Sequence, residues 1–166
     1  MGLYAVVSSV GGFSREDSSS ATLIGAYSDP QNARVAAISS HSTVENNPIK
    51  VDEILKGYIE YAKHFNVELE VNTPSKDGTL YAVVYMKDGF SREDSSTPGV
   101  VGIYTNEKTA HMIKRFIGST ANVVDFKPDH LAIGYAETAK AIGLKISEEI
   151  TVYTPESQYK NRLKLR

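Results

Sequence analysis

The chain of 166 residues contains no cysteine. It therefore has no disulfide framework, no thiolate nucleophile and no zinc site or iron–sulfur cluster held by sulfur. No apolar run is long enough to cross a bilayer, and no basic-then-apolar leader opens the sequence. The absence of cysteine fits a reducing compartment, so we expect a cytoplasmic protein.

Familiar catalytic motifs are missing as well. The sequence has no His-Glu-x-x-His, no Gly-x-Ser-x-Gly and no phosphate loop that ends in Gly-Lys-Ser/Thr. The net charge is only −2, and no basic stripe interleaves with aromatic side chains as in many nucleic-acid-binding proteins. We therefore predict no enzyme, no cofactor and no metal site.

What the sequence does contain is an internal duplication. Gly-Phe-Ser-Arg-Glu-Asp-Ser-Ser, called the octapeptide below, occurs at residues 12–19 and again at residues 89–96. At the same offset of 77 residues, 25 of 63 aligned positions are identical. The predicted organisation is repeat one at residues 1–74, a linker at 75–79, repeat two at 80–155 and a basic C-terminal tail at 156–166.

Each repeat is predicted to fold as β-β-α-β-α-β. Apolar runs before and after the octapeptide are typical of two antiparallel strands, at residues 3–7 and 22–27 and again at 80–85 and 100–104. A third strand is expected at 46–51 and at 123–127. A closing strand is expected at 69–74 and at 150–155, where the second copy carries four inserted residues.

The two helices of each repeat have recognisable ends. Asp29 before Pro30, and Asn106 in the second copy, are good caps for helix one, which would stop at His41 and Gly118.

Asp52 and Asp129 align and are expected to cap helix two. That helix would end at Asn66 and Gly143, two residues that tolerate the left-handed conformation.

The predicted fold class is α+β, with two tandem repeats packed around a pseudo-twofold axis. Repeats of about 75 residues are near the lower limit for an independent core, which favours packing of one on the other. An arrangement as separate beads stays open, because the linker Ser75-Lys76-Asp77-Gly78 is flexible enough for either.

The octapeptide is the candidate binding site, because polar loops normally diverge faster than strands and this one has not. Its arginines would present planar forks to a carboxylate or phosphate, assisted by serine hydroxyls. Two other interpretations stay open: a loop that folds on itself through Asx and Ser turns, and carboxylate ligation of Ca²⁺ or Mg²⁺. The candidate residues are Phe13, Ser14, Arg15, Glu16, Asp17, Ser18 and Ser19 with Phe90, Ser91, Arg92, Glu93, Asp94, Ser95 and Ser96.

Two other features bear on function. Gly57 and Gly134 are retained inside helix two, and we expect another backbone to approach them closely. None of the four histidines has a histidine at the matching position of the other copy, which excludes a duplicated histidine site but not a single one.

The tail at residues 156–166 carries four Lys or Arg against one Glu. It could contact phosphate backbones or an anionic partner, or it could be a solvated terminus.

Each repeat begins with the same series of features. In the first copy these are a strand at residues 3–7, an Asp/Ser-rich loop at 13–19, a Gly-x-Tyr-Ser strand at 25–28 and a helix start with alanine at 29–33, and the series repeats from residue 80. This pattern resembles small uncharacterised domains of bacteriophages, large DNA viruses and some bacteria. The resemblance implies a phage or viral accessory factor, and we expect it to bind a host protein through the octapeptides. The alternatives are a binder or sponge of a phosphorylated small molecule or nucleotide, and a hydrolase that uses the octapeptide carboxylates. Nucleic-acid contact would involve only the tail, no membrane contact is expected, and the oligomeric state is open.

Overall fold

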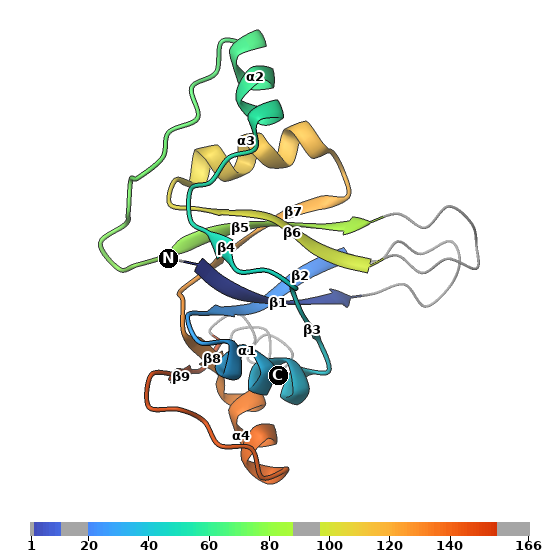
Figure 1. Cartoon of the computed structure of the whole chain (residues 1–166), viewed down its shortest axis with the longest axis vertical. Coiled ribbons are helices and arrows are strands. Elements are labelled where there is room, and N and C mark those ends of the chain that lie inside the picture. The colour runs from blue at the N-terminus through green and yellow to red at the C-terminus, as the bar shows by residue number, and fades with distance from the viewer. Residues whose placement is uncertain (1, 11–19, 88–96, 156–166) are drawn as a thin grey trace, which may run out of the picture.

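The computed structural model describes residues 2–10, 20–87 and 97–155. It is an α+β fold, as predicted, in which two antiparallel sheets lie face to face between helices (Figure 1). The first sheet contains β1 (Gly2–Val10), β2 (Ser20–Tyr27), β3 (Thr43–Val44) and β4 (Ile49–Lys50). The second contains β5 (Leu80–Lys87), β6 (Thr97–Tyr104) and β7 (Ala121–Phe126). A short parallel pair is formed by β8 (His130–Ala132) and β9 (Thr151–Tyr153).

In the described ranges, α1 (Pro30–Ser40) and α3 (Glu107–Ile117) cover the outer faces of these sheets. The helices α2 (Lys56–His64) and α4 (Ile133–Ala141) pack further out, on α3 and α1 respectively. Elements of the first half recur in the second at the sequence offset: α1 and α3, like α2 and α4, begin and end 77 residues apart. The register shift between β1 and β2 at Val6/Val7 recurs between β5 and β6 at Val83/Val84. None of the helices in the described ranges is long and apolar enough to cross a membrane.

The central strands are buried on both faces, which explains their continuous apolar sequence. Leu3, Ala5 and Val7 of β1 point between the sheets, into a core shared with Ala82 and other residues of β5 and β6. Val6 points the other way, into the core beneath α1. Strands buried on both faces read as unbroken apolar runs rather than as an alternation. The two repeats therefore share one core and do not sit apart as beads.

The second helix of each repeat packs on the other repeat. In Figure 1, α2 lies beyond α3 at one end of the molecule and α4 lies beside α1 at the other. Leu131 and Ala136 from the second half join Val6 and Ala36 in one core, and Ile54 and Tyr58 from the first half join the core around Ile113. The chain thus crosses from one sheet to the other twice.

Helix one is as predicted in both repeats. The Asp29 carboxylate accepts a hydrogen bond from the Gln31 N–H at 2.8 Å, and the Asn106 side-chain oxygen accepts from the Thr109 N–H at 3.0 Å. His41 (φ 54°) and Gly118 (φ 112°) follow the last helical residues with positive φ.

The predicted ends of helix two are confirmed, with φ of 57° at Asn66 and 83° at Gly143. The residues that follow them, Val67 and Leu144, donate their backbone N–H groups to the carbonyls of Ala62 and Ala139, each at 2.8 Å. This is the bonding pattern of a left-handed helix terminus.

The predicted start of helix two is wrong. The helices begin at Lys56 and Ile133, after Leu55 and Ala132, and neither of those two residues makes a side-chain cap. Asp52 and Asp129 lie before these positions with left-handed backbones, φ 64° and 59°. Their carboxylates bind the other repeat, as described below.

The third and closing strands are confirmed in the second repeat only, as β7 and β9. In the first repeat the predicted strand at 46–51 contains only β4, and β3 lies before it at residues 43–44. These two short strands pair with β1 two residues out of register with each other. Two extra residues loop out between β3 and β4, near Pro48, whose backbone lacks the N–H needed for sheet pairing. Residues 69–74 form no strand.

Candidate functional site

The octapeptide residues lie outside the described part of the chain, so the structure gives only the strand ends that flank them. Val10 of β1 pairs with Ser20 of β2, and Lys87 of β5 pairs with Thr97 of β6. All four strand ends lie at the same end of the two-sheet body (Figure 1). The segments that contain Phe13–Ser19 and Phe90–Ser96 therefore leave from neighbouring positions on one end of the molecule.

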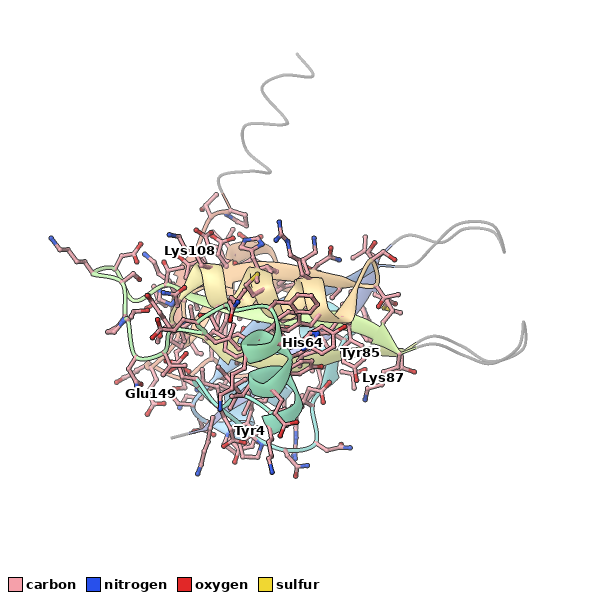
Figure 2. The ribbon with its side chains drawn as sticks, turned by 90° about the horizontal axis from the view of Figure 1, so that it is seen from above. Tyr4, His64, Tyr85, Lys87, Lys108 and Glu149 are labelled. Carbon is pink, nitrogen blue, oxygen red and sulfur yellow. The ribbon has the colours of Figure 1, made fainter. Side chains whose placement is uncertain are left out.

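This end of the body carries polar and apolar groups from both repeats. Figure 2 labels Tyr85 and Lys87 beside the point where β5 ends. Val10 at the end of β1 is 55% exposed. The Asn122 side-chain amide of β7 donates a 3.4 Å bond to the Ala21 carbonyl of β2, which joins the two sheets here. The strand ends that flank the two octapeptides are thus held in place relative to each other.

Asp52 and Asp129 form matching bridges between the repeats. The Asp129 carboxylate accepts from the N–H and the hydroxyl of Ser28, at 2.9 and 2.8 Å. The Asp52 carboxylate accepts from the N–H and hydroxyl of Thr105, at 2.9 and 2.6 Å, and from the Asn72 N–H at 2.7 Å. Bonds to a charged acceptor are stronger than neutral ones. The retention of both aspartates therefore has a structural explanation.

The retained pairs Gly25/Tyr27 and Gly102/Tyr104 are also structural. A Cβ at Gly25 would clash with the Tyr27 hydroxyl, and one at Gly102 would clash with the Tyr104 hydroxyl. Each ring folds back over its own strand, and only glycine leaves room for it. Both tyrosines are buried, and this burial raises their pKa well above the usual value for a phenol.

The predicted close approach at Gly57 and Gly134 is wrong, because a Cβ at either position would meet no atom within 4 Å. Nothing in the structure explains why glycine is retained there. Tyr58 and Tyr135, the next residues, are partly buried in the outer cores.

One cleft of about 480 Å³ lies where β9 meets β7 and the linker. The Nδ1 atom of His130 lies 2.9 Å from the Pro128 carbonyl, and because a carbonyl can only accept, Nδ1 is the donor of this bond. The rings of His130 and Tyr153 are 6.1 Å apart. Burial is the main cause that raises the pKa of Tyr153. The cleft is lined by Ile24, Gly25, Thr79, Asp125, Phe126, Lys127, His130, Thr151, Tyr153, Thr154 and Pro155.

A second cleft, of about 710 Å³, runs between α3 and the segment that follows α2. Its α3 wall carries Lys108, His111 and Arg115, and its other wall carries Glu68 and Glu70. The mixture of both charge signs gives it no clear preference for an anion or a cation. Within residues 2–10, 20–87 and 97–155, no three histidine or acidic side chains converge as a metal site would require.

Sequence reasoning missed both clefts, because each is built by contact between the repeats. His130 aligns with Glu53, and Tyr153 with Asn72, so internal comparison gave no signal for them.

No protein-family model matches the chain, and no curated protein or solved structure is significantly similar to it.

Proposed function

We propose that this chain is a non-enzymatic binding protein whose two octapeptides together form one recognition face for a protein partner. The observation that carries the proposal is the common placement of the four flanking strand ends, Val10, Ser20, Lys87 and Thr97, at one end of a single body. Two copies of one binding element at one end of a rigid body can engage a ligand jointly, which multiplies their affinity.

A second argument comes from the other residues retained between the repeats. Gly25 and Tyr27, Asp52, and the apolar run of β1 each have a packing or hydrogen-bonding role within the body. The octapeptide is a run of eight consecutive identical residues between two strands, and it lies outside the described residues. Selection by a ligand would account for them.

Each octapeptide offers one guanidinium, on Arg15 or Arg92, and this group pairs with carboxylates and phosphates through two parallel hydrogen bonds. The partner would therefore present two acidic or phosphorylated positions. In keeping with the resemblance described above, we take this partner to be a host protein and the chain to be a phage or viral accessory factor.

The experiment is capture from cell lysate with immobilised protein, comparing wild type with the Arg15→Ala/Arg92→Ala variant. The matched control is Arg34→Ala/Arg115→Ala, which removes two exposed arginines from α1 and α3. Circular dichroism and a thermal melt check that all three proteins fold.

Loss of one specific protein band in the octapeptide variant alone would support the proposal. A bound compound with nucleotide absorbance, lost in the same variant, would instead support binding of a phosphorylated small molecule. Equal capture by all three proteins would contradict both.

A further inference from the structure

The two repeats differ at the segment that follows their second helix. In the second repeat, β9 pairs in parallel with β8, with His130 opposite Thr151, Leu131 opposite Val152 and Ala132 opposite Tyr153. The Thr151 N–H also donates to the Asp129 carbonyl at 2.9 Å. This added strand closes the flank of α4.

In the first repeat the matching segments are residues 53–55 and 70–72, and they do not pair. No backbone hydrogen bond joins them in the described structure. Asn72 instead donates to the Asp52 carboxylate, and the Glu70 carbonyl accepts from the Thr109 hydroxyl at 2.7 Å. These bonds hold residues 70–72 near β6 and α3. Backbone groups of residues 53–55 are therefore left without a strand partner.

A groove of about 490 Å³ lies between these unpaired segments. Its walls are mainly apolar, and Val71 is 36% exposed and Ile59 39% exposed. Leu55, just before α2, is 59% exposed. The groove is lined by Asp52, Ile54, Ile59, Ala62, Lys63, Val67, Glu68, Leu69 and Val71. An apolar groove beside an unpaired extended segment suits the addition of a peptide strand.

The charge around the groove indicates what would fill it. Residues 52–71 carry five carboxylates (Asp52, Glu53, Glu60, Glu68 and Glu70) against Lys56 and Lys63. The C-terminal tail, residues 156–166, has the opposite charge, with four Lys or Arg against one Glu. It ends in Arg162-Leu163-Lys164-Leu165-Arg166, an alternation that places both leucines on one face of a strand and the cations on the other.

We propose that the tail, through residues 162–166, adds as a strand to the groove beside α2 of a second copy of this chain. Leu163 and Leu165 enter the apolar groove, and the cations face the surrounding carboxylates. In the first repeat, this added strand occupies the position beside the second helix that β9 occupies in the second repeat.

The binding is between copies for a geometric reason. Pro155 ends the described structure next to β9, whereas α2 lies toward the opposite end of the molecule (Figure 1). The six residues from 156 to 161 extend at most about 20 Å. A body of this length has a radius of gyration of about 15 Å, so 20 Å does not span it from end to end. Reciprocal exchange of two tails gives a closed dimer.

The test is the mass in solution, by light scattering on a sizing column, of the full chain and three variants. Leu163→Ser/Leu165→Ser changes the tail, and Val71→Asp places a charge in the groove. Val152→Asp is the matched control, because Val152 is the residue that aligns with Val71 and is 44% exposed. We expect a dimer for the full chain and for Val152→Asp, and a monomer for the other two.

A binding measurement separates this inference from general loss of folding. A fluorescent peptide of residues 156–166 is titrated with the Leu163→Ser/Leu165→Ser protein, whose groove is intact, and binding should weaken at least tenfold when Val71→Asp is added. A monomeric full chain, or equal peptide binding with and without Val71→Asp, would overturn the proposal. Because neither measurement involves the octapeptides, the result is independent of the proposed function.

Discussion

The two helix pairs solve the same packing problem with different residues. Between α1 and α4 the contact is made by small side chains, with Ala33, Ala36 and Ala37 meeting Ala136. Between α3 and α2 it is made by large ones, and Phe116 lies 6.3 Å from the ring of Tyr58 and 5.0 Å from that of Tyr61.

This difference decides how completely each pair is buried. Alanines let α4 come close to α1, and Ala139 is fully buried while Ala136 is nearly so. In α2 the buried residue is Ala62, and Tyr61 and nearby Phe65 stay more than half exposed. The two copies can thus share one chain path although α2 stays more exposed than α4 and is available for contact.

The largest effect should come from Ile113→Ala, which converts an α3 position to its α1 counterpart, Ala36. Ile113 is fully buried beneath α2, so the change leaves a cavity and should destabilise the protein by about 2–5 kcal/mol. The measurement is urea unfolding followed by circular dichroism. A loss below about 1 kcal/mol, the low end for buried large-to-small changes, would mean that the α2 side relaxes freely.

Asp52→Asn should have the next largest effect. The amide retains size and tolerance of a positive φ but loses the charge that binds Thr105 and Asn72, so we expect a loss of about 1.5–3 kcal/mol. Asp129→Asn should lose less, because among the described residues that carboxylate binds the side chain and N–H of Ser28 alone. Equal losses in the two urea titrations would contradict the difference between the repeats.

Ala36→Ile makes the reverse exchange and tests the close contact on the α4 side. The added volume has no space between α1 and α4 and should cost about 1–3 kcal/mol through displaced side chains and backbone. If thermal unfolding showed no loss, α1 and α4 would be no more closely packed than α3 and α2.

Tyr27→Phe should have the smallest effect. The Tyr27 hydroxyl donates a 3.1 Å bond to the His130 carbonyl across the repeats, and its removal should cost about 1 kcal/mol. The Tyr104 hydroxyl makes no such bond to the described residues, so Tyr104→Phe serves as the matched control and should cost less in the same urea titration.

Local features were predictable from the sequence because short-range rules control them. The caps Asp29 and Asn106 and the left-handed ends at Asn66 and Gly143 follow from residue type and spacing alone. The antiparallel hairpins followed from apolar runs on either side of a polar loop.

What could not be predicted depends on contacts between the repeats. Asp52 looked like a helix cap because a carboxylate before a helical pattern usually is one, yet its partner Thr105 lies 53 residues away. The exchange of second helices has no sequence signature, since Ile54 and Leu131 would be apolar in either arrangement. The octapeptide prediction falls on residues that the structure does not describe.

The central claim is that the two octapeptides act together on one ligand. The most direct measurement is the amount of the specific partner captured from lysate by wild type, by Arg15→Ala, by Arg92→Ala and by the double variant. If both arginines hold one partner, each single change should remove most of the capture and the double change should add little. If each single variant retained about half the wild-type amount, the two octapeptides would be independent sites and the account would be contradicted.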